Sequence, residues 1–356
     1  MSDAPGSAEN IASISVIMPA FNAAHYLEKS LPPLIAMRKR GEVAEVIVVD
    51  DCSTDPSSVA TAQRLGATIL EMPENGGPGA ARNFAAKVAV GDILWLVDAD
   101  VIVHDDAAHH VARNLADPEF GAVFGSYDDH PPATNFASSY KNLVHRYYHQ
   151  RGHAESDTFW SGCGAIKKCV YDELGGFDGT RYGRPSIEDI EFGFRMRKAG
   201  WRIRLDPQLL ATHLKHWRLG EVVRTDIFQR ARPWSFLILS GRGMNDDLNV
   251  SQNERLKAGI AGLWVIAILA SANPFWHPHA GLALLLTTAA VLLANWPLFR
   301  FFQRARGPAF ALAACAYHQF YYLYSAATFV ACAIAYHLGG KKDAVVRRAD
   351  IHKISA

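Results

Sequence analysis

The chain has 356 residues, of which 49% are hydrophobic, enough for one large domain with an additional unit or for two ordinary domains. Its 36 lysines and arginines nearly balance its 35 aspartates and glutamates, so the net charge of +1 excludes a protein drawn to nucleic acid by its overall field. The five cysteines are odd in number and scattered, which argues against a disulfide framework and fits a reducing compartment. They are Cys52, Cys163, Cys169, Cys315 and Cys332.

The first hundred residues alternate short apolar runs with helical stretches. After a short tail, predicted to be disordered (1–12) and too polar for a signal peptide, strands are expected at 14–18, 45–49, 67–71 and 92–97. Helices are expected at 23–38, 56–65 and 79–90. This alternation predicts a parallel sheet of βα units, whose ligands bind beyond the carboxyl ends of the strands. Polar residues follow several of those ends, namely Asn22, Asp50, Asp51, Asp98 and Asp100.

The middle of the chain contains two further predicted helices. One lies near 136–151 and is rich in His and Tyr, but its buried face cannot be assigned from the pattern. The other covers 184–200, with Ser186 as its expected N-cap, acidic residues in its first turn and Gly200 after its end.

The chain changes character after Trp217. Residues 221–240 mix arginines, Trp234 and aliphatic side chains, as expected of an amphipathic helix at a membrane surface. Uncharged apolar runs follow at 258–276, 280–299 and 309–338, and three in succession predict transmembrane helices. Basic residues flanking the first two runs indicate the cytoplasmic side, yet three crossings would place the basic tail outside. A bend or an interfacial end in the third run would remove this conflict.

Asp98 and Asp100 follow an apolar strand, DILWLV, as an Asp-x-Asp pair. Mg²⁺ or Mn²⁺ takes one or two carboxylates from a protein and further ligands from substrate phosphates, so the pair is a candidate metal site. The alternative is a solvated turn, which the apolar strand disfavours. His213, after the strand-like stretch RIRLDP, is a candidate third ligand.

Asp50 and Asp51 have the same position after a strand. They serve either as a turn or helix cap, or as acceptors for a nucleotide base or ribose hydroxyl. The stretch NGGPGAARN (75–83) opens a helix, where backbone N–H groups favour phosphate and Arg82 adds a fixed cation. A tight turn would explain the glycines but not the arginine.

Glu188 and Asp189 open the helix at 184–200. Capping explains acidic residues there, but with Glu191 they place three carboxylates in four residues, more than capping requires. Asp189 is therefore a candidate general base that removes a proton from a sugar hydroxyl.

Six stretches in order resemble the inverting family 2 glycosyltransferases of GT-A fold, over about residues 13–217. They are SVIMPAFNA, VIVVDDCSTD, NGGPGAARNFAA, GDILWLVDAD, GGFDG and IEDIEFGFRMRKAGW. The resemblance implies donor contacts from Ala20, Asn22, Asp50, Asp51, Arg82, Asp98, Gly175 and Gly176. It also implies a metal at Asp98 and Asp100, and Asp189, with Glu188 beside it, as the catalytic base. Two departures are Cys52, where the family has glycine, and Pro233, which interrupts the Gln-x-x-Arg-Trp of processive synthases.

The expected architecture is an α/β GT-A (Rossmann-like) catalytic domain (13–220), an interfacial connector (221–256), about three transmembrane helices (257–338) and a basic tail (339–356). The expected activity is metal-dependent (Mn²⁺ or Mg²⁺) inverting transfer from a nucleotide sugar to a membrane-associated acceptor. Arg230, Arg232 and Trp234 are expected to meet lipid headgroups or the acceptor's phosphate.

Three alternatives compete with this activity: a processive polysaccharide synthase, a nucleotidyltransferase and a nucleotide-sugar-binding protein without turnover. The altered Gln-x-x-Arg-Trp motif disfavours a processive synthase, and the Glu-Asp helix disfavours a nucleotidyltransferase. The complete set of acidic motif residues disfavours a binding protein without turnover. The expected location is a bacterial inner or plasma membrane, with the catalytic domain in the cytoplasm.

Overall fold

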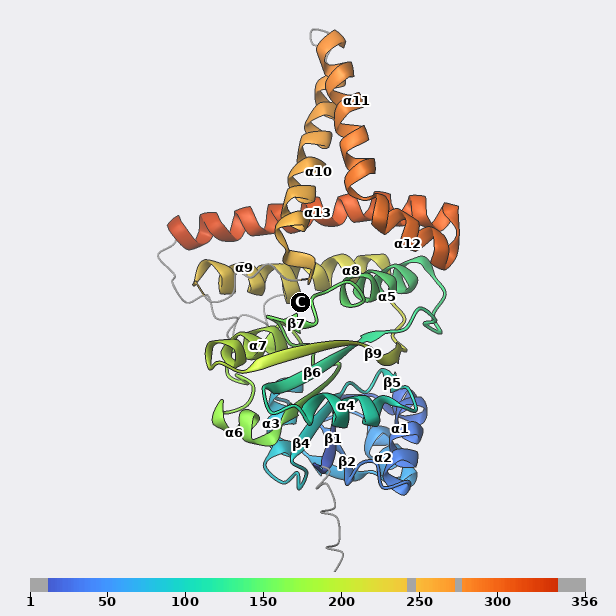
Figure 1. Ribbon diagram of the computed structural model, residues 1–356, viewed down its shortest axis with the longest axis vertical. Helices are drawn as coiled ribbons and strands as arrows, with labels where there is room; N and C mark the ends of the chain where they lie inside the picture. The colour runs from blue at the N-terminus through green and yellow to red at the C-terminus, as the bar shows by residue number, and fades with distance from the viewer. Residues whose placement is uncertain (1–11, 242–247, 273–276, 339–356) are drawn as a thin grey trace, which may run out of the picture.

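A computed structural model describes residues 12–241, 248–272 and 277–338 (Figure 1). The predicted N-terminal tail, apart from Ala12, and the basic C-terminal tail lie outside the described residues. The N-terminal part, residues 12–217, contains a nine-stranded sheet with helices on both faces, and the remaining helices lie beyond one side of it (Figure 1).

The first half is the expected parallel βα unit. Its elements are β1 (Ile14–Ala20), α1 (Ala24–Lys39), β2 (Glu45–Asp50), α2 (Ser57–Leu65), β3 (Thr68–Glu71), α3 (Pro78–Ala86) and β4 (Ile93–Val97). The strands lie in the order β3-β2-β1-β4, all parallel, so the sequence prediction is confirmed here. Each face of the sheet has its own buried apolar cluster, which explains why the central strands are apolar on both sides.

The second half extends this sheet with strands of mixed direction. Its elements are β5 (Val101–Val103), α4 (Ala107–Leu115), β6 (Phe120–Tyr127), α5 (Phe136–His149), β7 (Glu155–Ser156), β8 (Cys163–Lys167), α6 (Lys168–Glu173), α7 (Glu188–Lys198) and β9 (Arg202–His213). β8 is antiparallel to both β4 and β6, and β6 is parallel to β9. The sheet thus continues β4-β8-β6-β9-β5.

The predicted cap of α7 is wrong by one residue. Ile187 is the N-cap and makes no side-chain capping bond. The backbone N–H of Ser186 instead donates to Glu188 Oε2 at 2.8 Å, and the Ser186 hydroxyl donates to the carbonyl of Gln229 at 3.0 Å. Ser186 therefore links the catalytic domain to the segment that follows it.

Cys52 adopts a left-handed backbone conformation, with φ of 58°. Glycine reaches this conformation without steric cost, whereas cysteine is strained there. The Cys52 thiol donates to the carbonyl of Met72 at 3.0 Å, so the side chain links the loop after β2 to the end of β3.

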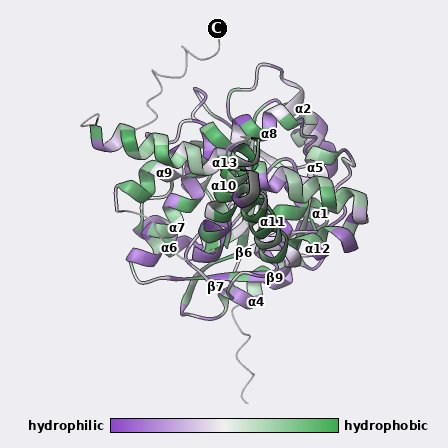
Figure 2. Cartoon of the chain, turned by 90° about the horizontal axis from the view of Figure 1, so that it is seen from above, coloured by the Kyte–Doolittle hydropathy of each residue, from purple (hydrophilic) through white to green (hydrophobic). Residues whose placement is uncertain are grey.

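The C-terminal part is helical. It comprises α8 (Leu219–Thr225), the π-helical η1 (Asp226–Ala231), α9 (Arg232–Leu239), the short η2 (Leu248–Val250), α10 (Gln252–Ser271), α11 (His277–Ala294), α12 (Trp296–Arg306) and α13 (Pro308–Leu338). α10 and α11 form a hairpin that projects from the molecule, while α12 and α13 lie crosswise at its base (Figure 1). Seen from above, the hairpin helices are coloured as hydrophobic (Figure 2).

The three predicted transmembrane helices are not confirmed. Among the described residues, no single helix is both long and apolar enough to span a bilayer, and one pair, His279–Ala294 with Trp296–Arg306, meets those criteria with a 59° bend. The bend divides the apolar run predicted at 280–299 into two helices. The run predicted at 309–338 is one helix, α13, which packs on α9, α10 and α12.

Two buried carboxylates join the C-terminal helices to the catalytic domain. Glu254 of α10 accepts hydrogen bonds from the hydroxyls of Tyr148 on α5 at 2.7 Å and Tyr322 on α13 at 2.5 Å. Asp226 of η1 pairs with Lys141 of α5 and accepts from the Tyr324 hydroxyl at 2.8 Å. A buried charge is tolerated only with such partners, so these bonds determine how the helices dock.

Candidate active site

A buried arginine lies at the centre of the carboxylates that the sequence singled out. Arg82, on the second turn of α3, is 2% exposed. Its Nη2 donates to Asp98 Oδ1 at 2.5 Å, its Nη1 lies 3.6 Å from Glu188 Oε1, and its guanidinium lies 5.5 Å from the centre of the Phe177 ring. One cation therefore brings together the end of β4 and the start of α7, which are 90 residues apart in sequence.

Asp100 and His213 meet beside this centre because of strand pairing. β5 is antiparallel to β9, with Val101 opposite His213, and the backbone N–H of Leu214 donates to the carbonyl of Asp100 at 2.8 Å. Asp100 Oδ2 lies 3.5 Å from His213 Nε2. The His213 ring stacks on Tyr127, with ring centres 4.6 Å apart. The predicted proximity of these two residues is thus observed.

The donor atoms fit a divalent cation that also binds substrate phosphate. No group of three His, Cys, Asp or Glu side chains with metal-binding geometry occurs in the part of the chain that the structure describes. Asp100 and His213 form a two-residue set, the number that Mg²⁺ or Mn²⁺ uses when phosphates and water supply the other ligands. Asp98 Oδ1 accepts a hydrogen bond from Arg82. This bond does not prevent the carboxylate from binding a metal, and the metal role of Asp98 stays a prediction.

The Glu188-Asp189 pair projects from the first turn of α7 into the same site. Asp189 Oδ2 accepts from the backbone N–H of Ser161 at 3.1 Å and from its hydroxyl at 3.2 Å, and Oδ1 accepts from the Ile190 N–H at 2.9 Å. Asp189 is half-buried, whereas Glu188 is buried against Arg82. The two adjacent acids thus have different surroundings.

Burial and mutual repulsion shift the protonation of these acids. Burial, followed by the charge of Asp189, raises the pKa of Glu188 to about 7, although Arg82 opposes the shift. Burial also raises the pKa of Asp98, against the attraction of Arg82. Burial would raise the pKa of Asp100 too, but the hydrogen bond and charge of His213 lower it below its ordinary value. Of Glu188, Asp98 and Asp100, only Asp100 therefore has a lowered pKa, which favours its ionised form.

The acids after β2 hold the loops of the predicted donor site. Asp50 accepts from the Ser53 N–H at 3.0 Å and from its hydroxyl at 2.5 Å. Asp51 accepts from the N–H groups of Gly76 and Gly77 at 2.7 and 2.8 Å. These bonds match the turn alternative, and contact with a nucleotide base stays a prediction.

The residues after β1 have a similar linking role. Asn22 Oδ1 accepts from the Thr54 N–H at 2.9 Å, and the Asn22 N–H donates to the Ser53 hydroxyl at 2.8 Å, which joins the loops after β1 and β2. Ala20 is the last residue of β1, and its carbonyl accepts from the Asp51 N–H at 2.8 Å. Both residues lie at the predicted edge of the sheet, and contact with the nucleotide stays a prediction.

Gly175 and Gly176 both have positive φ values, 73° and 70°, which any other residue would adopt only with strain. A side chain at Gly176 would also come within 2.4 Å of Asn83 Oδ1. Turn geometry therefore accounts for the glycine pair, and a role near the donor phosphates stays a prediction.

The three residues expected at the membrane surface lie in different places. Arg230 is exposed and lies close enough to Tyr127, Lys141 and His145 for its charge to act on them. Arg232 is exposed on α9, and its charge acts on Cys332 of α13. Trp234 is 9% exposed and packs with Tyr182, Ile187 and Leu237, so its expected place in a headgroup layer is wrong for this structure.

An aromatic wall beside Asp100 was not predicted from the sequence. It is formed by Tyr127, His145, His149 and Trp160, with Tyr127 4.2 Å from His145 and 4.9 Å from Trp160 between ring centres. Both ring nitrogens of His145 are buried without a hydrogen-bond partner among the described residues, and burial lowers its pKa well below the ordinary value. The His- and Tyr-rich composition of the helix near 136–151 was the only available indication, because periodicity did not show which face is buried.

The family comparison agrees with this geometry. Residues 15–175 match the family described as Glycosyl transferase family 2. This match covers less than half of the chain, and over these residues the chain resembles a family 2 glycosyltransferase domain. The chain is 24% identical over 225 residues to the poly-beta-1,6-N-acetyl-D-glucosamine synthase of Staphylococcus aureus (strain COL), a match that covers 60% of this chain and 52% of the relative.

A second relative is the pre-mycofactocin glycosyltransferase of Mycobacterium tuberculosis (strain CDC 1551 / Oshkosh), 26% identical over 234 residues, or 63% of this chain and 47% of that protein. The chain spans about half the length of the curated relatives it matches. Among solved structures, the mannosyltransferase PcManGT from Pyrobaculum calidifontis, in complex with GDP-Man and Mn2+, has a TM-score of 0.50 at 20% identity. This match covers 90% of this chain and 87% of that one, and it supports the GT-A fold.

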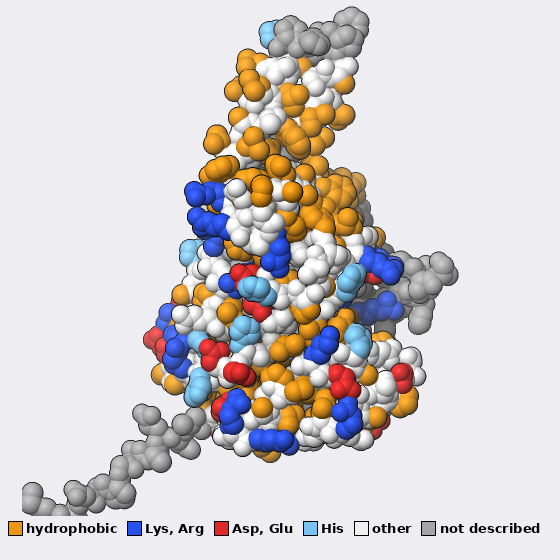
Figure 3. Space-filling view, turned by 90° about the vertical axis from the view of Figure 1, so that its right-hand side faces the viewer, with side chains coloured by type: hydrophobic (Ala, Val, Ile, Leu, Met, Phe, Trp, Pro, Cys, Tyr) orange, Lys and Arg blue, Asp and Glu red, His pale blue; other side chains and the backbone are white. Residues whose placement is uncertain are grey.

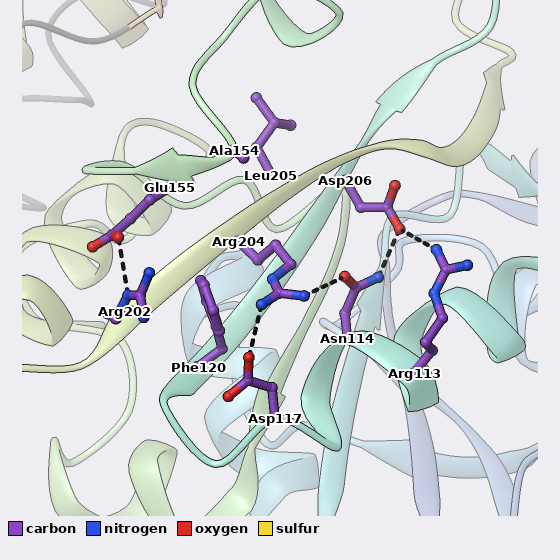
Figure 4. A pocket seen from close by; sticks show the side chains of 10 residues that line it. All are labelled: Arg113, Asn114, Asp117, Phe120, Ala154, Glu155, Arg202, Arg204, Leu205 and Asp206. Atoms are coloured by element: carbon purple, nitrogen blue, oxygen red, sulfur yellow. Dashed lines mark hydrogen bonds and ion pairs between the residues drawn. The ribbon is translucent and has the colours of Figure 1, made fainter.

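A cavity lies away from the carboxylates of the candidate site. It has a volume of 460 Å³ and lies between α4, β6 and β9 (Figure 4). Its arginines are paired: Arg204 with Asp117 at 2.9 Å, Arg202 with Glu155 at 2.9 Å, and Arg113 with Asp206 at 3.4 Å. Such a self-neutralised surface indicates no particular charged ligand.

The two aspartates of the Asp-x-Asp pair are expected to differ in their effect on stability. Asp98→Asn leaves the buried Arg82 without its closest counter-charge and should lower the unfolding free energy by about 2 kcal/mol. This is below the cost for a fully buried pair, because the Asp98 side chain is 37% exposed. Asp100→Asn should change stability by less than about 1 kcal/mol. Chemical denaturation of both variants tests this, and equal losses would contradict the assignment of Asp98 to Arg82.

The raised pKa of Glu188 predicts a pH-dependent loss of stability. The folded protein binds this proton more tightly than the unfolded chain, so the stabilisation is complete below pH 4.5 and is lost as the pH rises through about 7. Glu188→Gln should remove this dependence, so its stability relative to the wild-type enzyme should increase by about 3 kcal/mol between pH 4.5 and 8. Denaturation curves across that range provide the measurement. Parallel pH profiles for the two proteins would show that Glu188 titrates normally.

Proposed function

We propose that the protein is an inverting glycosyltransferase that moves a sugar from a nucleotide-sugar donor to an acceptor presented at a membrane. One observation carries this proposal: Arg82 holds Asp98 and Glu188 together, which places Asp189 in the same site as the Asp100–His213 pair. A site with a metal-binding side and a base side matches a single displacement at an anomeric carbon.

Asp100 and His213 would hold the divalent cation, which would neutralise the charge that develops on the leaving nucleoside diphosphate. The structurally similar mannosyltransferase is in complex with GDP-Man and Mn2+, which supports both a nucleotide sugar and a divalent cation for this chain. Arg82 would orient the Asp98 carboxylate at the edge of the donor site.

Asp189 would act as the general base. The N–H and hydroxyl of Ser161 orient its carboxylate, and an acceptor hydroxyl that gives its proton to Asp189 attacks the anomeric carbon. The bond to the diphosphate breaks on the opposite face as the new glycosidic bond forms, so the configuration inverts. With an acceptor that is already an anionic phosphate, the same carboxylate would orient the acceptor.

The surface of the hairpin supports membrane attachment. Large apolar side chains are exposed along both helices: Leu263, Ile266, Ile268 and Leu269 on α10, and Leu282, Leu285, Leu286, Leu292 and Leu293 on α11. Hydrophobic side chains cover the projecting hairpin in the space-filling view (Figure 3). Exposed apolar patches of this extent mark membrane or protein interaction sites.

Insertion of the hairpin would also remove the conflict between three membrane crossings and the distribution of basic residues. α11, with 18 residues, is about 27 Å long, close to the thickness of a hydrocarbon core. If α10 and α11 enter the bilayer and α12 and α13 lie at its surface, the basic residues around α10 and in α12 stay on one side. That arrangement agrees with a cytoplasmic catalytic domain.

The location of Arg230 supports a lipid-borne acceptor. It lies close enough for its charge to act on Tyr127, on which Asp98 and Asp100 also act. Lys141 is already paired with Asp226, so Arg230 is the cation that we propose for an acceptor that carries phosphate. A processive polysaccharide synthase is the alternative, supported by the name of the staphylococcal relative and opposed by Pro233 in the Gln-x-x-Arg-Trp position.

A screen of nucleotide sugars with the purified protein tests the proposed activity. We expect hydrolysis or transfer of one donor class that depends on Mn²⁺ or Mg²⁺ and stops in the presence of a chelator. Asp189→Asn should lower turnover at least about 100-fold, the range of general-base catalysis, with little change in thermal stability. Chain-length analysis of the product separates single transfer from polymerisation. Unchanged turnover in the variant would eliminate Asp189 as the base for a hydroxyl acceptor.

Arg230→Gln and Arg232→Gln form a matched pair for the acceptor. Both residues are exposed, but the charge of Arg230 acts on Tyr127 beside the candidate site, whereas that of Arg232 acts on Cys332 of α13. Arg230→Gln should reduce transfer to extracted lipid acceptor by about tenfold, because it removes a charged contact to phosphate, and should spare a water-soluble analogue without phosphate. Arg232→Gln should affect neither acceptor strongly. Equal effects of the two substitutions on the lipid acceptor would count against Arg230 as a phosphate contact.

A further inference from the structure

A small cationic cavity lies where the hairpin joins the catalytic domain. It has a volume of 260 Å³ and is formed by the end of α5 and one face of α12. The residues that line it are Tyr147, Gln150, Arg151, Pro297, Arg300, Phe301 and Arg304. It lies outside the set of residues assigned above to donor, metal or acceptor.

The charges of this cavity are not balanced. All three of its arginines are exposed, its lining contains no acidic residue, and none of the three forms an ion pair within the described ranges. Arg151 lies over the Tyr147 ring at 5.3 Å. The larger cavity of Figure 4 differs, because each of its arginines has a carboxylate partner.

The spacing of two of the arginines brings their like charges close together. Arg300 and Arg304 are four residues apart on α12, so their side chains lie on the same face, where like charges destabilise a helix. The opposite face of α12 is buried through Leu298 and Phe302, which fixes the direction of the arginines. A bound anion would offset the repulsion between them.

The location of the cavity indicates the source of that anion. α12 follows α11 after a single residue, so the arginines lie at the foot of the exposed apolar hairpin. Trp296, at the start of α12, is 53% exposed, as is common for tryptophan at a membrane–water interface. Lysine and arginine side chains gather below the hydrophobic hairpin in the space-filling view (Figure 3).

We propose that Arg151, Arg300 and Arg304 form a binding site for the phosphate of an anionic membrane phospholipid, with the aromatic rings of Tyr147 and Phe301 against its glycerol and upper acyl region. This inference rests on the proposed membrane attachment of the hairpin. Guanidinium groups bind phosphate through paired, charge-assisted hydrogen bonds, which a lysine ammonium cannot reproduce. Basic pockets beside membrane helices bind anionic headgroups for the same reason.

Vesicle flotation with the full chain tests the site. Binding to phosphatidylcholine vesicles measures hairpin insertion alone, and the increase upon adding phosphatidylglycerol measures recognition of the anionic lipid. Arg300→Gln/Arg304→Gln should reduce that increase at least about tenfold and leave binding to neutral vesicles unchanged. Lys39→Gln/Lys87→Gln removes two exposed charges at the C-terminal ends of α1 and α3, helices that lie away from the hairpin (Figure 1), and should have little effect.

Arg300→Lys/Arg304→Lys tests whether the protein recognises the lipid phosphate specifically or is only attracted to the negative charge of the vesicle. This variant keeps both charges, so wild-type binding to anionic vesicles would overturn the proposal in favour of non-specific electrostatics. We expect it to lose most of the increase, and native mass spectrometry should show phosphatidylglycerol retained by the wild-type protein alone. Displacement of that lipid by millimolar inorganic phosphate would overturn the proposal in favour of a site for free phosphate. Failure to bind neutral vesicles would instead refute membrane attachment.

Discussion

The buried guanidinium of Arg82 is the interaction on which the candidate site depends. It lies on the helix that follows the glycine-rich loop, and it contacts carboxylates from both halves of the catalytic domain, Asp98 and Glu188. A buried cation requires such counter-charges. Separation of the two halves would therefore expose Arg82 to solvent or leave its charge buried without a carboxylate partner. The same cation limits repulsion within a site that holds at least four acidic side chains.

These contacts also determine how the pKa values of the neighbouring acids differ. Asp100 has a histidine neighbour and a lowered pKa, whereas the buried Glu188 has a pKa near 7, although both are acids within the same site. Environments that differ in this way allow neighbouring carboxyl groups to take different roles. In the proposed function, Asp100 would hold a cation and Asp189 would accept a proton, while Glu188 would act with Arg82 as a positioning pair.

The C-terminal helices combine polar anchoring with an apolar outer surface. Glu254 and Asp226 are satisfied by tyrosines and a lysine across the junction, so the helices are joined to the catalytic domain through specific hydrogen bonds. The hairpin beyond that junction exposes leucines and isoleucines, and the cationic cavity lies between the two regions. This order of surfaces is the one expected at the boundary between cytoplasm and bilayer.

The sequence by itself determined the parallel βα half, the positions of its strand-end acids and the resemblance to family 2 glycosyltransferases. Local patterns carry that information, because strand alternation and motif spacing are short-range properties. Tertiary structure alone decided that Asp98 is bonded to Arg82, that Trp234 is buried, and that Arg230 and Arg232 face different neighbours. It also decided that the apolar run at 280–299 bends and that α13 packs along other helices, because hydropathy does not show which neighbours a helix will meet.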